Sequence, residues 1–200
     1  MKNAIKLFGF LLFVPLLSSC MLPGRELVTN AGQISPNQVV IIGKVILTPP
    51  LEKDEQKYQA VGTEGFRNKM LLITGDQMRE VSTPLSIGDL GGRIEAPFEK
   101  TFFAKSDAKP FYVLLGDIVT RTGSSSEMGG MAFPAGFKVD IQPGDRAIYI
   151  GTIHYYRDEF SRVTKVEVVD QYDEALSLYQ KNFGGTGELK KELVTISLQQ

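Results

Sequence analysis

The side chains that most often perform catalysis are scarce in this chain, which has one histidine, His154, and one cysteine, Cys20, among 200 residues. Nucleophilic catalysis needs a nucleophile with a base in hydrogen-bond reach, and histidine is the commonest base. His154 precedes Tyr155 and Tyr156, so it is either a base or ligand beside aromatic rings or an ordinary residue near a strand end. The sequence has no Gly-x-Ser-x-Gly motif, and we expect the ordinary role.

Metal chemistry is also poorly supplied. A zinc centre takes three or four histidine, cysteine or carboxylate ligands. Met128 and Met131 could offer two thioethers to Cu(I), although apolar contact is a sufficient role for them. Helix capping and the positive end of a helix explain the acidic cluster Asp170, Asp173 and Glu174. We predict no metal or cofactor site, while two carboxylates meeting in the fold as a hydrolase pair stays an alternative.

Cys20 ends a three-part pattern at the start of the chain. Lys2 and Lys6 form a positive region, and Leu7–Leu17 follows as an apolar run. The small residues Ser18 and Ser19 then lead to a cleavage site, which completes the pattern of a secretory signal. A membrane-spanning helix needs about 20 apolar residues, more than this run provides. We therefore expect a signal peptide over residues 1–19, cleaved between Ser19 and Cys20, in preference to an uncleaved membrane helix.

The tetrad Leu17-Ser18-Ser19-Cys20 resembles the lipobox of bacterial lipoproteins. The resemblance implies that Cys20 carries diacylglycerol and a further acyl chain such as palmitate, and that the chain is anchored in the cell envelope. Two or three acyl chains hold a protein on a membrane essentially permanently. Met21 replaces the aspartate that favours inner-membrane retention, so the resemblance implies the periplasmic face of the outer membrane. A lipidated Cys20 is unavailable as a nucleophile, disulfide partner or metal ligand.

Composition is that of an ordinary globular protein, with 42% hydrophobic and 22% charged residues. Removing residues 1–19 leaves 181, and lowers the basic count from 22 to 20 against 23 acidic residues. This balance is too acidic for nucleic-acid binding. Proline and glycine interrupt the sequence up to residue 38, so we expect a lipidated, flexible tether over 20–38 and a single β-rich domain over 39–200.

Short runs of β-branched and aromatic residues between 20 glycines and 10 prolines predict a mainly β fold, an antiparallel β-sandwich or barrel-like domain with one short C-terminal helix. The first run, 39–47, is apolar at consecutive positions and is typical of a strand buried on both faces. An apolar stripe over 172–183, capped by Asp170 and stopped by Gly184-Gly185, predicts the helix. The other expected strands are 70–74, 98–104, 111–120, 137–141, 147–153, 163–169 and an edge strand over 194–198.

Turn residues predict how these strands connect. Pro143-Gly144 indicates a hairpin between the strands 137–141 and 147–153. Residues 157–159 indicate a second hairpin, which joins 147–153 to 163–169. Four Gly-Asp pairs, which begin at Gly75, Gly88, Gly116 and Gly144, predict turns. The glycine- and serine-rich segment 122–137 predicts a mobile loop. We expect the aromatic group Tyr149, Tyr155, Tyr156 and Phe160 to pack within the fold rather than to form a binding surface, leaving 157–162 as a solvated turn.

The stretch 133–151, with its Phe133–Phe137, Pro143–Asp145 and Tyr149–Gly151 segments, resembles the small immunoglobulin-like or transthyretin-like sandwiches of envelope lipoproteins. This resemblance implies a binding or structural module. We therefore expect a lipid-anchored, non-catalytic binding or assembly protein with a possible envelope protein partner. The alternative is an envelope hydrolase that uses acidic residues.

Overall fold

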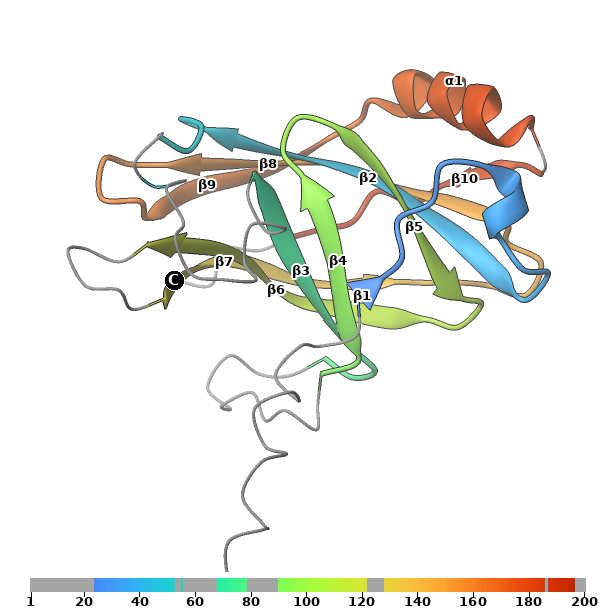
Figure 1. Ribbon diagram of the computed structural model, residues 1–200, viewed down its shortest axis with the longest axis horizontal. Coiled ribbons are helices and arrows are strands. Elements are labelled where there is room, and N and C mark those ends of the chain that lie inside the picture. The colour runs from blue at the N-terminus through green and yellow to red at the C-terminus, as the bar shows by residue number, and fades with distance from the viewer. Residues whose placement is uncertain are drawn as a thin grey trace, which may run out of the picture.

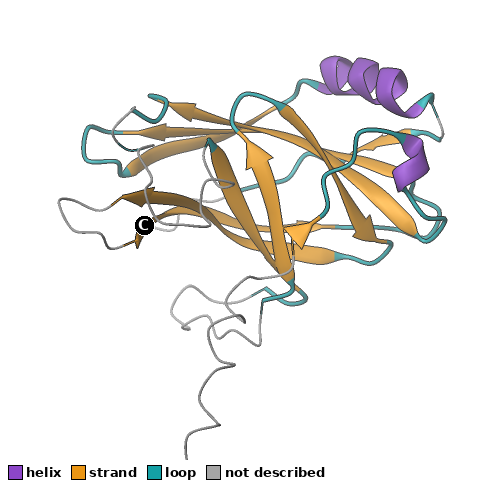
Figure 2. Ribbon diagram, viewed as in Figure 1, coloured by secondary structure: helices purple, strands orange, loops and turns teal. Residues whose placement is uncertain are grey.

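Two β-sheets face each other and a helix covers one of them (Figures 1 and 2). The computed structural model describes residues 24–52, 55, 68–78, 90–121, 128–185 and 187–196. The expected β-sandwich with one C-terminal helix is confirmed, and the sheets do not close into a barrel. In chain order the elements are β1 (Gly24–Arg25), the 3₁₀ helix η1 (Ala31–Gln33), β2 (Gln38–Thr48), β3 (Lys69–Gly75), β4 (Gly92–Pro97), β5 (Thr101–Asp107), β6 (Phe111–Arg121), β7 (Met128–Val139), β8 (Ala147–Arg157), β9 (Val163–Val169), α1 (Tyr172–Phe183) and β10 (Leu189–Lys191).

Both sheets are mixed, whereas antiparallel sheets were expected. The first has the order β1-β4-β3-β6-β7, and its β1 is parallel to β4. The second has the order β10-β8-β2-β5, in which β8 is parallel to both β2 and β10. The far edge of β8 is shared, because β10 pairs with its first residues and β9 with its last.

Strand β2 has apolar side chains buried on both of its faces, as its sequence predicts. Ile41 and Val45 belong to the inner core between the two sheets. Val40 and Ile42 belong to an outer core, where they pack with α1. Within α1 the apolar positions buried there are Ala175, Tyr179 and Phe183, spaced by four residues as a helix requires.

The ends of α1 are close to those predicted. Gly184 ends the helix in the left-handed conformation, with φ of 65°. The N-cap position is Gln171, one residue after the predicted cap, Asp170. Asp170 nevertheless accepts a hydrogen bond from the backbone N–H of Tyr172 at 3.0 Å.

Residues 24–28 are part of the sandwich, which corrects the flexible tether expected over 20–38. β1 pairs with β4 of the first sheet, and Leu27 forms a bridge with Ala104 in β5 of the second. Val28 is 2% exposed, and its N–H donates to the carbonyl of Phe103. This N-terminal strap, residues 24–28, therefore joins an edge of one sheet to an edge of the other.

The hairpin predicted around Pro143-Gly144 is wrong. β7 pairs with β6 in the first sheet, whereas β8 pairs with β2 in the second, so the turn carries the chain between sheets. β7 also occupies residues 128–137 of the predicted loop, and residues 122–127 lie outside the described part of the chain. The β8–β9 hairpin, by contrast, is confirmed.

Two further predictions need correction. Gly116 and Asp117 lie inside β6 rather than in a turn. The C-terminal edge strand is β10 at 189–191, and Val194 and Ile196 pack against the inner core outside any strand. Residues 1–23, with the predicted cleavage site, and residues 197–200 are outside the described residues.

Candidate binding site

His154 lies on the outer face of the second sheet, beyond the half that α1 covers. Its Nε2 is 2.7 Å from Oγ1 of Thr48 on the neighbouring strand β2. Its ring stacks on that of Tyr156, with 4.1 Å between centroids and 25° between planes. The only histidine of the chain is thus held by a cross-strand threonine and a tyrosine ring, as an ordinary strand residue can be.

Tyr156 contacts three residues of its own sheet, His154, Lys165 and Glu167. Lys165 lies 5.2 Å from the ring centroid, while His154 stacks on the ring. The hydroxyl donates to Glu167 at 2.9 Å, and this bond raises the pKa of Tyr156. The bond from Lys165, and after it the bond from Tyr156, lower the pKa of Glu167. These contacts all lie within the second sheet and indicate cross-strand stabilisation.

The remaining aromatic residues divide between core and surface. Tyr149 and Tyr155 are buried, as expected, and the Tyr155 hydroxyl donates to the carbonyl of Pro134. Burial raises the pKa of Tyr155. Phe160, at the β8–β9 turn, is 70% exposed and lies near Arg162, so its predicted packing role is wrong.

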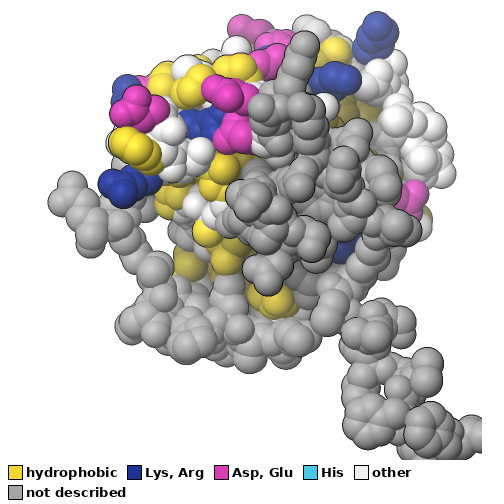
Figure 3. All heavy atoms as spheres, turned by 60° about the vertical axis from the view of Figure 1, so that its left-hand side comes forward, with side chains coloured by type: hydrophobic (Ala, Val, Ile, Leu, Met, Phe, Trp, Pro, Cys, Tyr) yellow, Lys and Arg dark blue, Asp and Glu magenta, His cyan; other side chains and the backbone are white. Residues whose placement is uncertain are grey.

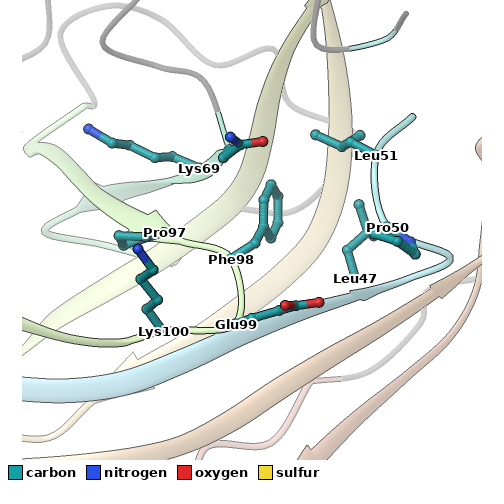
Figure 4. Close-up of a pocket in the computed structure, with 9 residues that line it drawn as sticks. Leu47, Pro50, Leu51, Lys69, Pro97, Phe98, Glu99 and Lys100 are labelled. Atoms are coloured by element: carbon teal, nitrogen blue, oxygen red, sulfur yellow. The ribbon is translucent and has the colours of Figure 1, made fainter. Parts of the chain in front are cut away.

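A hollow of about 510 Å³ opens where β2 ends, β3 begins and β4 turns into β5 (Figure 4). The Phe98 ring stands in its middle, with Leu47, Pro50 and Leu51 on one side and Lys69, Pro97 and Lys100 on the other. The end hollow, as we name it, is lined by Leu47, Pro50, Leu51, Asn68, Lys69, Pro97, Phe98, Glu99 and Lys100. An apolar floor with a charged rim is the usual composition of a protein interface.

Backbone hydrogen bonds tie the three walls of the end hollow together. The N–H of Phe98 donates to the carbonyl of Asn68 at 3.0 Å, and the N–H of Glu99 to that of Val45 at 2.8 Å. Asn68 and Glu99 both have positive φ, 55° and 62°. Such strained positions in residues other than glycine concentrate at functional sites.

The charges on the rim differ in how they are satisfied. Lys69 forms an ion pair with Glu95 at 3.0 Å. Arg93 also pairs with Glu95, and the two cations together hold the pKa of Glu95 below its usual range although burial opposes them. Glu99 and Lys100 are exposed and make no ion pair with another described residue. They are available to a partner.

Arg157 fixes the Pro49-Pro50 wall of the end hollow. Its side chain is 4% exposed, and all five of its N–H donors are used. Nε donates to the carbonyl of Pro49 at 3.0 Å and Nη2 to that of Pro50 at 2.8 Å. Both Nη atoms also donate to the Glu55 carboxylate, and Nη1 donates to Oγ of Ser161. The bond from Arg157 lowers the pKa of Glu55.

The prediction that 157–162 is only a solvated turn is therefore wrong for Arg157. A signal for its burial was present in the sequence. Ile153 and Tyr155 point into the inner core, and continuing the two-residue period places Arg157 on the same face. Figure 3 brings this side of the molecule forward, where acidic, basic and hydrophobic side chains lie intermingled on the described surface.

Among the described carboxyl groups, Asp117 differs from the rest because burial raises its pKa. The described carboxylates with a lowered pKa each hydrogen-bond a lysine or arginine: these are Glu55, Glu95, Asp140, Glu167 and Asp170. A hydrolytic pair needs two carboxyl groups whose environments push their pKa values apart across a substrate. The described contacts give Asp117 no such partner.

The residues considered for metal binding lie apart or serve other contacts. Met131 packs against the inner core, and the side chain of Met128 is outside what the structure describes. Asp170 pairs with Lys191, and Glu174 pairs with Lys44 at 3.3 Å. Within the described ranges, three or more histidine, cysteine or acidic side chains are nowhere arranged to hold a metal ion.

The lipidation and cleavage residues, Cys20 and Ser19, precede the first described residue, Gly24. Within the part of the chain that the structure describes, no helix is long and apolar enough to cross a bilayer. Comparison with protein-family models, with curated proteins and with solved structures gave no match for this chain.

Proposed function

We propose that this chain is a lipid-anchored, non-catalytic binding or assembly module of the bacterial cell envelope, which presents the end hollow to a partner protein. Acyl chains on Cys20 attach it to the membrane, and the periplasmic face of the outer membrane is its location. The observation that carries the binding role is the end hollow, whose wall is fixed by the fully bonded Arg157.

The rigidity of the end hollow supports recognition rather than mere packing. A preformed surface loses less conformational entropy on association than a loose one. Arg157 removes freedom from Pro49 and Pro50, and the bonds of Phe98 and Glu99 fix the opposite wall. The rim charges of Glu99 and Lys100, which make no ion pair with another described residue, supply polar specificity around an apolar centre.

The anchor is tested by Cys20→Ala in the producing bacterium. The wild type incorporates radioactive palmitate and matures by losing residues 1–19, whereas the variant stays a full-length, unlabelled precursor. Acyl labelling that persists in the variant would contradict the anchor.

The partner site is tested by a photoreactive amino acid at Lys100 in living cells, with Gln180 on the exposed side of α1 as the matched control position. We expect a discrete crosslinked protein from Lys100, absent from Gln180, and abolished by Pro50→Asp in the exposed wall of the end hollow. Equal capture at both positions, or capture insensitive to Pro50→Asp, would rule the site out.

The alternative, an envelope hydrolase, has the raised pKa of Asp117 in its favour, because a general acid needs such a shift. The two functions separate through one variant. If the protein is a binding module, Asp117→Asn leaves the crosslinking of the partner at position 100 unchanged. If it is a hydrolase, the same variant abolishes hydrolysis of its substrate.

A further inference from the structure

The N-terminal strap holds the start of the described chain firmly on the sandwich. Arg25 lies over the Phe111 ring at 4.2 Å from its centroid and donates to Oγ of Ser106. Burial lowers the pKa of Arg25 although Asp107 and Asp76 oppose the shift. Pairing with β4, pairing with β5 and the burial of Val28 hold the other residues of the strap.

Very little chain separates this strap from the anchor. Four Cα steps join Cys20 to Gly24, and at their full extension they reach about 14 Å. A tether that was free as far as residue 38 would reach about 65 Å by the same measure. The short reach restricts which face of the protein can meet the bilayer.

The strap and the β8–β9 turn lie at opposite ends of β2. Ser106, the partner of Arg25, pairs with Val39 near the start of the strand, and Thr48 at its end pairs with Tyr156 just before the turn. The 11 residues of β2 span roughly 33 Å. In Figure 1, β1 lies low beside β4, whereas the β8–β9 turn lies at the far left. The turn is therefore beyond the reach of the tether, whereas the end hollow lies nearer to it, because Lys69 on its rim pairs with Glu95 beside Gly24.

We infer that the β1 end of the sandwich rests against the lipid headgroups, and that the β8–β9 turn points away from the membrane. This orientation rests on the lipid anchor proposed above. The surface at the β1 end carries cations and anions side by side, as in the pairs Arg93–Glu95 and Lys109–Asp76. Because neither positive nor negative charge dominates this surface, the short tether sets the orientation. The orientation should therefore not change with salt concentration.

Fluorescent labels on the acylated full chain test the orientation, because Cys20 is blocked and a new cysteine is the sole reactive thiol. Asp76→Cys places a label near the strap, and Glu159→Cys places one on the β8–β9 turn; both positions are exposed. The proteins are reconstituted in vesicles of phosphatidylethanolamine and phosphatidylglycerol that contain a headgroup nitroxide lipid. We expect loss of fluorescence at position 76 and none at position 159, at both low and high salt.

A linker of about 15 glycine and serine residues inserted between Met21 and Leu22 provides the control, because it restores rotational freedom. It should remove the difference between the two labels, whereas the same insertion after Gly185 should leave the difference intact. Equal quenching of the two labels in an acylated protein, or no effect of the Met21 insertion, overturns the orientation. A mass spectrum without acyl chains on Cys20 overturns the anchor and the orientation together.

Discussion

Arg157 is satisfied by groups that come from remote parts of the chain. Glu55 is 102 residues away in sequence, and the carbonyls of Pro49 and Pro50 are 108 and 107 away. A buried ion pair adds little net stability, because desolvation of both charges offsets their attraction. Its removal is costly, since the partners are left without donors. The role that we assign to Arg157 is therefore to define the shape of the hollow wall.

Arg157→Met tests this role at the residue scale. It leaves two carbonyls and a carboxylate without their donors, and we expect the free energy of unfolding to fall by about 3 kcal/mol. Urea denaturation followed by circular dichroism measures the change. Arg162→Met, on the same turn but exposed, is the matched control and should shift stability by less than about 0.5 kcal/mol. Equal effects would mean that Arg157 is not specially bound.

The Glu55 carboxylate makes part of the stability dependent on pH. Its pKa in the folded protein lies below its ordinary value of 4.5, chiefly because Arg157 donates to it. A depressed pKa gives stability that is present above 4.5 and is lost as pH falls through the folded value. We expect Glu55→Gln to be destabilising at pH 7 and much less so near pH 3, in urea titrations at each pH.

Glu188→Gln is the control for this pH dependence, since Glu188 is exposed and makes no ion pair with another described residue. Its stability should follow that of the wild type at every pH. A stability difference between wild type and Glu55→Gln that stayed constant from pH 7 to pH 3 would disprove the proposed linkage.

At the scale of elements, Gly116 shows how a turn-like pair can lie within a strand. It is buried in β6, where an added Cβ would lie 2.7 Å from Sδ of Met70 and 3.2 Å from Cβ of Phe133. The close packing of β3 and β7 around β6 therefore requires glycine at this position. Local propensity did not reveal it, because Gly-Asp is also a common turn pair.

Gly116→Ala should destabilise the protein by about 1–3 kcal/mol, through overpacking between the sheets. Gly91→Ala is the matched control, because its added Cβ would have no neighbour closer than 3.6 Å. That variant should be neutral or slightly stabilising. Thermal unfolding of the two variants compares the two glycines. A Gly116→Ala protein as stable as the wild type would show that the Met70 side chain moves aside at no cost in stability.

The elements themselves were largely predictable, while their partners were not. The run 39–47 predicted a strand buried on both faces because its apolar side chains alternate between two cores, and the stripe over 172–183 predicted α1. Pro143-Gly144 predicted a reversal of the chain, which occurs, but a turn does not specify which strands pair after it. β8 pairs in parallel with β2, more than 100 residues earlier, and no local signal encodes that choice.

The candidate site was predicted even less well. The sequence directed attention to His154 and Tyr156, whose contacts are satisfied within the second sheet. The end hollow combines the ends of β2, β3 and β4, so its existence depends on long-range pairing. Asparagine, as at Asn68, is a residue type that often adopts positive φ, but Glu99 carries no sequence mark of its positive φ.

On the scale of the whole molecule, both ends of the described chain complete the sandwich. The strap joins β4 to β5 across the two sheets. At the other end the backbone N–H groups of Glu192 and Val194 donate to β8, and Val194 enters the inner core. Edges that would otherwise offer unpaired backbone groups to other chains are thereby covered.

Removal of the strap tests its place in the whole molecule. A soluble protein that starts at Met21 should fold alone, with a β-type circular dichroism spectrum, because all the described elements are present. A protein that starts at Thr29 lacks Arg25 and Val28, and uncovers edges of β4 and β5. We expect it to lose about 2 kcal/mol, which corresponds to a fall in Tm of roughly 4–8 °C.

The uncovered edges should also promote association, which light scattering detects as oligomers in the Thr29 form at concentrations where the Met21 form stays monomeric. Arg25→Ala in the Met21 form provides an intermediate step, because it removes the contact with Phe111 and keeps the strand pairing. Its Tm should lie between those of the two proteins. Identical Tm values for the Met21 and Thr29 forms would show that 21–28 behaves as a free tether, and would also remove the basis for a fixed orientation on the membrane.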